Sequence, residues 1–312
     1  MPNPLRTTLF AILGTIIAGE IVWKILGHFD VDMQSYGLLA SFSLAFLLSS
    51  VFYERIRKNP SIGSMLFGLG FLLIFAASVN VVSYFGLTIA GPRIDEPLAA
   101  IDRALGVDWL ELMLFTTSHP ALNFIFQVAY SVSLYETLLL MILWGWNDRT
   151  RLTEQLCLAL VIGGIVTVIT WISMPSFGAF TVYTIPTTPA LKSALALNAD
   201  YARLLLHLWT HGPGHISPLT VKGLVGFPSF HAAQAIIATW YARKTRFLFY
   251  PFLAFNTVVI LSTPIQGGHH VVDVIGGLAV AAFAIWIATL AGNRLVATKN
   301  EKKTVPALVT VS

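Results

Sequence analysis

The stretch "LCLALVIGGIVTVITWISM", residues 156–174, decides the fold class of this chain. It runs without a charged side chain for about the twenty residues that a helix needs to cross the hydrocarbon core of a bilayer. Similar apolar runs recur along the 312 residues, of which 56% are hydrophobic and only 11% are charged. A soluble domain carries about a quarter charged residues. The sequence therefore predicts an all-α, polytopic integral membrane helical bundle.

We expect about eight transmembrane helices, with the sixth one short. Their predicted positions are residues 8–27, 36–53, 64–89, 121–146, 156–174, 228–242, 247–264 and 271–292. Because the first run is longer than a signal-peptide core and lacks a small-residue cleavage site before the next run, we interpret it as a retained span. The lone Cys157 lies in an apolar run, so no intrachain disulfide is expected.

The basic residues follow alternate connections between these spans. Most Lys and Arg lie in residues 54–61, 147–155, 243–246 and 293–303, whereas 28–35 and 264–268 hold none. The positive-inside rule then places both termini in the cytoplasm of an inner-membrane protein. The net charge of +4 is spread over these loops, so it indicates orientation and no nucleic-acid partner.

Two long connections fall on the predicted outer face. Residues 90–120 carry Ile94, Leu98, Ile101 and Leu105 at helical spacing, which is typical of an amphipathic helix at the membrane interface. Residues 175–227 are rich in Pro, Gly and Thr, and a loop of this length usually contacts substrate or forms a lid.

A short polar motif opens the sixth span, in "GLVGFPSFHAAQA" at residues 223–235. Pro228 suits a first helical turn and Ser229 can cap that turn, so free N–H groups and the helix dipole would form an anion site. His231 lies in the same turn, close to any anion bound there. The alternative is that Ser229 only caps the helix and His231 only anchors it at the headgroup level.

A second motif opens the last span, in "STPIQGGHHVVDVIGG" at residues 262–277. His269 and Asp273 are four residues apart and share a helix face, so the carboxylate can accept the imidazole N–H and orient the ring. The alternative is a pair that only stabilises the helix. Together the motifs place two histidines and an aspartate at one membrane face. One histidine could attack phosphorus, the aspartate could orient it, and the other histidine could protonate the leaving oxygen, with no metal and no cofactor.

These motifs resemble the second and third signature motifs of the type 2 phosphatidic acid phosphatase superfamily. The closest resemblance is to its inositol phosphorylceramide synthase-like branch, whose motifs read PSFH and GxHxxxD. The resemblance implies that His269 is a nucleophile that forms a phosphohistidine and that Asp273 is its partner. It also implies that His231 is the general acid and later the base, and that Ser229 binds phosphate.

The resemblance covers about residues 64–292 and implies a six-helix phosphatase-like core formed by the third to eighth spans. We therefore expect an N-terminal pair of spans in residues 1–63, a catalytic membrane domain in 64–292 and a basic cytoplasmic tail in 293–312.

The chain departs from the superfamily's pattern at its cations. Residues 175–227 lack the K-x6-R-P motif, and Ser262 is followed by Thr263 instead of Arg. Another cation is expected to help to hold the phosphate. Arg203, Lys222 and Arg93 are the candidates, and the favoured alternative for each is an ordinary interfacial base that contacts lipid headgroups.

The sequence thus predicts a metal-independent headgroup phosphotransferase with its site facing the periplasm or exterior. Its substrate would be a phospholipid or lipid-linked phosphate, and its acceptor a lipid or polyol hydroxyl. A lipid phosphate phosphatase that uses water is the alternative. A transporter that uses Glu136 and the helix-mouth histidines is a third, less favoured class.

Overall fold

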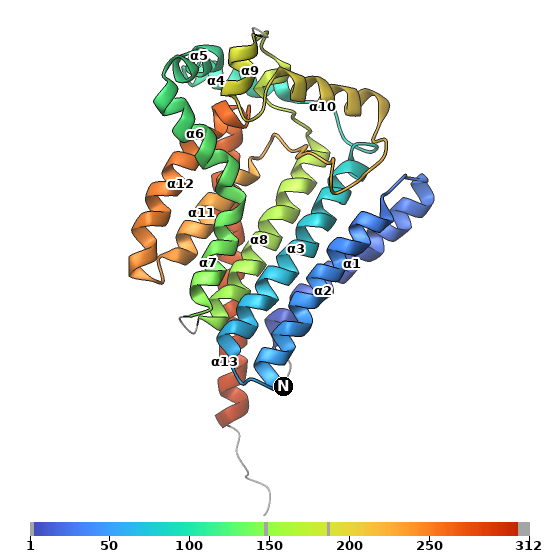
Figure 1. The fold of residues 1–312 in the computed structure, drawn as a ribbon, viewed down its shortest axis with the longest axis vertical. Coiled ribbons are helices and arrows are strands. Elements are labelled where there is room, and N and C mark those ends of the chain that lie inside the picture. Colours follow the sequence, from blue (N-terminus) through green and yellow to red (C-terminus); the bar gives the residue numbers. More distant parts are fainter. Residues whose placement is uncertain (1–2, 147–148, 186–187, 305–312) are drawn as a thin grey trace, which may run out of the picture.

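The computed structural model describes residues 3–146, 149–185 and 188–304, with the side chains of the last helix described as far as residue 294. Its described residues form helices and one isolated bridge, and seven helical segments are long and apolar enough to cross a membrane. The predicted all-α polytopic fold is therefore confirmed (Figure 1). The seven segments are α1 (Pro4–Gly27), α2 (Met33–Arg55), α3 (Pro60–Gly86), the pair α6 (Pro120–Val132) and α7 (Glu136–Trp144), α8 (Thr150–Ser173), α12 (Arg246–Gln266) and α13 (Val271–Thr304).

The sixth predicted span is short, as expected. It forms α11 (Phe230–Ala242), whose 13 residues give a length of about 20 Å at 1.5 Å per residue. The hydrocarbon core is about 30 Å thick, so α11 is not among the seven long segments. The preceding chain is not helical and includes the buried Gly226, whose N–H donates to the Ser176 carbonyl at 2.8 Å. Such backbone is tolerated at membrane depth where protein encloses it. The start of α11 is therefore recessed into the bundle.

The centre of the bundle is α8. In α8, 61% of the most apolar window is buried, against 11% in α1 and in α2, so these two N-terminal helices lie at the periphery. α3 packs between them and α8, and its Phe67, Phe71 and Phe75 rings form a stacked series.

One end of the bundle gathers the basic segments, and we call it the basic end. Arg6 at the start of α1 binds Glu54 at the end of α2 and Glu154 near the start of α8. Arg151 contacts the Gly292 carbonyl of α13. Figure 1 shows the N-terminus and the far end of α13 at this same end, as an even number of membrane crossings requires. α11 and its non-helical approach thus complete the crossing that α11 alone is too short to make.

The opposite end, which we call the site end, is covered by short helices (Figure 1). They are α4 (Asp95–Ala104), α5 (Trp109–Ser118), η2 (Ala179–Thr181), α9 (Pro189–Ala194) and α10 (Ala199–His211). A buried amide pair anchors the α9–α10 connection, because Gln266 Oε1 accepts the Ala196 N–H at 2.8 Å while Gln266 Nε2 donates to Asn123 at 2.8 Å.

The face of α4 that meets the protein is not the predicted apolar stripe. Ile101 and Leu105 are exposed, whereas Asp95, Leu98, Ala99 and Asp102 are buried. At a membrane interface the apolar side of a helix can face lipid, and the acidic side can then accept buried N–H groups. The predicted amphipathic helix is present, and its acidic side faces the protein.

Candidate active site

The starts of α11 and α13 meet at the site end. The Ser229 N–H donates to the Asp273 carbonyl at 2.9 Å, which ties one helix start directly to the other. Gly277 permits this approach, because a Cβ added there would lie 2.3 Å from the Ser229 carbonyl oxygen. The two sequence motifs, about forty residues apart in the chain, are therefore neighbours in space.

His269 is oriented by Asp273. Its Nδ1 lies 3.2 Å from Asp273 Oδ2, and the same oxygen accepts the His270 N–H at 2.9 Å. The predicted i,i+4 contact is present although α13 begins at Val271, so that His269 precedes the helix instead of lying in its first turn. Gly268, at a φ of 63°, makes the turn into this position. The other ring nitrogen of His269, Nε2, makes a long hydrogen bond of 3.4 Å with Ser229 Oγ.

His231, in the first turn of α11, lies close to His269. Its ring centroid is 6.5 Å from that of His269, and the two rings are inclined by 63°. Tyr130 of α6 stacks on the other face of His231, with centroids 4.4 Å apart. His269 and Asp273 are 4% and 0% exposed, whereas His231 is partly accessible. The structure thus brings His231, His269, Asp273 and Ser229 together.

The N-terminus of α11 remains open to an anion, whereas that of α13 does not. Ser229 is the N-cap of α11 and accepts the Ala232 N–H at a long 3.4 Å, and Pro228 lies before this cap, not in the first turn as expected. The first N–H groups of a helix have no acceptor within it. At α13 these groups are bound by Asp102 of α4, which accepts the N–H groups of Val271 and Val272 at 2.8 and 2.9 Å.

Asp102 is a residue that the sequence analysis missed. Burial acts to raise the pKa of its carboxyl, but the adjacent His270 imidazole and the two N–H donors outweigh burial and hold the pKa below its usual value. The available signal was its spacing of seven residues from Asp95, which places both carboxylates on one side of a helix.

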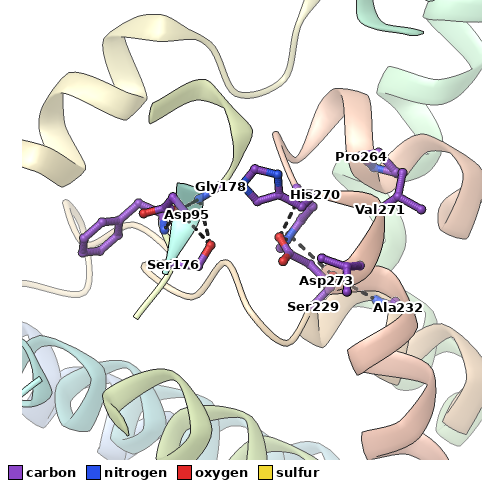
Figure 2. Close-up of polar contacts among 12 residues, drawn as sticks. Asp95, Ser176, Gly178, Ser229, Ala232, Pro264, His270, Val271 and Asp273 are labelled. Atoms are coloured by element: carbon purple, nitrogen blue, oxygen red, sulfur yellow. Dashed lines mark hydrogen bonds and ion pairs between the residues drawn. The ribbon is translucent and has the colours of Figure 1, made fainter. Parts of the chain in front are cut away.

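Asp95 organises the neighbouring turn. Its Oδ1 accepts Ser176 Oγ–H at 2.9 Å and the N–H groups of Phe177 and Gly178 at 2.7 and 2.9 Å. Figure 2 shows Asp95, Ser176 and Gly178 on one side of His270, and Asp273 and Ser229 on the other. This turn packs on the loop before His269, because the Ala179 N–H donates to the Gly268 carbonyl at 2.7 Å.

The predicted cations lie elsewhere among the described residues. Arg203 is exposed on α10 and paired with Asp200, and Lys222 is exposed, with its backbone N–H donating to Tyr84. Arg93 is paired with Asp95 at 2.7 Å and lies over the Phe177 ring. None of the three makes a described contact with the histidines or Ser229, and a phosphate-binding role for Arg203 or Lys222 remains a prediction.

Several buried polar atoms at the site have no hydrogen-bond partner among the described residues. They are Asp273 Oδ1 and both ring nitrogens of His270. Buried polar atoms in proteins are nearly always bonded, so each exception calls for an explanation. Across the same described part of the chain, no group of three or more His, Cys, Asp or Glu side chains is arranged to hold a metal ion.

Comparison with known proteins places the chain in a family. Searches of the curated proteins and of the solved structures each found no match. The family model of the PAP2 superfamily matches residues 96–287, which is more than half of the chain. The match starts in α4 instead of at residue 64, and it includes both helix starts with their histidines. Because the match covers more than half of the chain and includes the two helix starts that meet at the site, the chain belongs to the PAP2 superfamily.

Proposed function

We propose that the protein is a headgroup phosphotransferase that acts on a phospholipid or lipid-linked phosphate through a phosphohistidine at His269. Membership of the PAP2 superfamily supports a phosphatase-type activity on lipid phosphate. The observation that carries the finer proposal is the orientation of His269. Its Nδ1 is held by Asp273, and its Nε2 faces the start of α11, where His231 lies.

In the first half-reaction, Nε2 of His269 attacks the phosphorus and the bond between phosphorus and the leaving oxygen breaks. The leaving oxygen takes a proton from His231 and departs as a neutral alcohol. Asp273 stabilises the positive charge that develops on His269, as a buried carboxylate does for an oriented imidazole. The partial exposure of His231 suits a residue that must exchange protons with substrate.

In the second half-reaction, His231 is a base. It removes the proton from an acceptor hydroxyl, the acceptor oxygen attacks phosphorus, and the bond between phosphorus and His269 Nε2 breaks. Both histidines then return to their starting protonation states. The phosphoryl oxygens would be held by Ser229 and by the open N–H groups in the first turn of α11. Arg203 and Lys222 stay as candidates for headgroup contacts.

The nature of the acceptor separates transferase from phosphatase. His269 and Asp273 are buried and the start of α11 is recessed, which favours an acceptor hydroxyl that arrives within the membrane over bulk water. The missing K-x6-R-P motif and the missing Arg after Ser262 likewise favour the inositol phosphorylceramide synthase-like branch. A lipid phosphatase, which shares the whole first half-reaction, is the alternative.

One observation bears on the transporter class. A 3-10 turn, η1 (Ser133–Tyr135), interrupts the fourth predicted span just before Glu136, and a broken helix is typical of transporters. The Ser133 carbonyl at this turn accepts both the Glu136 N–H and Gln234 Nε2, the latter at 3.1 Å. The turn therefore needs no transported ion, and superfamily membership favours the enzyme.

The proposed orientation places the basic end in the cytoplasm and the site end at the periplasm or exterior of an inner membrane. A reporter fused after residue 303 should then behave as cytoplasmic. Periplasmic behaviour of that reporter would invert the proposed topology without affecting the proposed chemistry.

The test of function uses the purified full chain in vesicles that contain phosphatidic acid or phosphatidylinositol, with and without an acceptor, which is ceramide or a diacylglycerol whose acyl chains differ from those of the donor. Lipid mass spectrometry should detect a new phospholipid that depends on the acceptor. Turnover should be lost in His269→Ala and His231→Ala and retained in His207→Ala, a matched histidine change on exposed α10. Free phosphate without a new lipid would favour the phosphatase, and full turnover in His269→Ala would refute the assignment.

A further inference from the structure

The inward face of α4 carries two buried carboxylates at the site end. Asp95 and Asp102 are 2% and 0% exposed and lie two helical turns apart. Each binds backbone N–H groups of a different distant segment, residues 176–178 and residues 271–272 respectively. Backbone N–H groups of two segments are thus fixed by one short helix that is outside the catalytic motifs.

The contacts that lead back to α4 lie on either side of His269 in the chain. Before His269, the Gly268 carbonyl accepts the Ala179 N–H from the segment that Asp95 holds. After His269, Val271 and Val272 donate to Asp102. The backbone of His269 is therefore fixed on both sides through contacts that lead back to α4.

The charge of Asp102 also reaches the site. A carboxylate at a helix N-terminus offsets the positive end of the helix dipole, and Asp102 Oδ2 lies 3.6 Å from Nδ1 of the buried His270. The titratable groups around His269 are Asp273 and His270 from its own chain segment, His231 from α11 and Tyr130 from α6, and Asp102 of α4 lies behind them against His270. In this set Asp102 and Asp273 are the two carboxylates.

We propose that Asp102 is a positioning residue for His269, acting through the first turn of α13 and through its negative charge. This inference rests on the proposed function of His269. Asp102 itself would not touch the substrate, because its oxygens are occupied by Val271 and Val272. Loss of the cap would let the first turn of α13 shift, which would misalign His269 Nε2 with the phosphorus.

The test compares Asp102→Asn with Asp108→Asn in the full chain in lipid vesicles. Asp108 is a matched control, because it caps the start of α5 by accepting the Glu111 N–H at 3.0 Å and is exposed. Asp102→Asn should lower kcat about 10- to 100-fold, the range that a small misplacement produces, with KM for the lipid little changed. Asp108→Asn should leave both constants unchanged.

A second readout separates positioning from loss of structure. Removal of the negative charge of Asp102 destabilises the imidazolium form of the nearby histidines. The acid limb of the pH–rate profile of Asp102→Asn should therefore move to lower pH. A purely structural defect would lower the amplitude of the profile without moving that limb. An unmoved limb together with an unchanged kcat in folded Asp102→Asn would overturn the proposal.

Val271→Pro keeps the test decisive if Asp102→Asn does not fold. It removes one N–H that Asp102 accepts, and proline is favoured at the first position of a helix. It should lower kcat several-fold, and full activity in this variant would contradict the proposal. If wild type shows no lipid turnover, the proposed function fails; if wild type is active and both variants match it, only this inference fails.

Discussion

Carboxylates are withdrawn from water at both ends of the bundle, but the two ends treat them differently. At the basic end, Glu54 and Glu154 are held by Arg6 and Asn3, and all four carboxylate oxygens accept hydrogen bonds of 2.6 to 2.9 Å. At the site end, Asp273 leaves Oδ1 without a described partner, and His269 leaves Nε2 directed at a hydroxyl 3.4 Å away.

The difference distinguishes polar groups that stabilise the fold from polar groups that can bind a ligand. A charge cluster whose polar atoms are all hydrogen-bonded makes a fold rigid. Polar atoms that have no hydrogen-bond partner at a site can instead bind a ligand. The basic end therefore holds α1, α2 and α8 together, and the site end keeps capacity for a ligand. The following changes test this contrast, from the largest expected effect to the smallest.

His269→Ala removes the proposed nucleophile. We expect turnover to fall by about 10⁴-fold or more, as for other covalent nucleophiles that act in a unit. The unfolding temperature should change little, because His269 makes few bonds that hold helices together. Lipid turnover and thermal unfolding measured on one preparation provide the check, and a stable variant with residual activity above a tenth of wild type would contradict the contrast.

Asp273→Asn keeps the shape of the side chain and removes the charge that orients His269. The loss of turnover should be about 10³- to 10⁴-fold, the range seen when an orienting aspartate is replaced by its amide. Steady-state kinetics would show the loss mainly in kcat. A loss confined to KM would instead assign Asp273 to substrate binding.

Arg6→Gln removes the cation that binds Glu54 and Glu154 at the basic end. Breaking a buried ion cluster leaves uncompensated carboxylates, so the free energy of unfolding should fall by about 2–4 kcal/mol. Turnover per folded molecule should stay within about twofold, since the cluster lies at the opposite end of the bundle from His269. Adding Glu154→Gln should restore part of the stability, and a selective loss of activity without loss of stability would break the contrast.

Glu136→Gln extends the comparison to the buried carboxylate at the start of α7. Both oxygens of Glu136 lack a hydrogen-bond partner among the described residues, with Asn256 as the neighbouring polar side chain. Because the neutral amide has the same shape, we expect unchanged turnover and a change in unfolding free energy within about 1 kcal/mol. A tenfold loss of turnover would bring Glu136 into the mechanism.

The features that could be predicted from sequence are those set locally. The spans follow from runs of apolar residues, and the contact between His269 and Asp273 follows from their i,i+4 spacing. The alternation of basic loops predicts that both motifs lie at one membrane face, and the contact between the two helix starts depends on packing.

The features that could not be predicted depend on distant packing. Asp102 reaches Val271 across 169 residues of sequence, and Tyr130 meets His231 because α6 and α11 both pack against α12. The inward face of α4 could not be predicted, because lipid and protein can both cover an apolar stripe, so apolarity alone does not identify the protein side. The short length of α11 was expected, but hydropathy does not reveal the buried non-helical chain that precedes it.

The most direct measurement is to trap the phosphorylated protein. Vesicles that hold the full chain would be quenched during turnover of a ³²P-labelled lipid, and the labelled peptide would be identified by mass spectrometry. The account predicts an acid-labile, alkali-stable label on His269 that disappears in His269→Ala and persists in Arg6→Gln. A label on another residue, or turnover in which no protein-bound phosphorus forms, would contradict it.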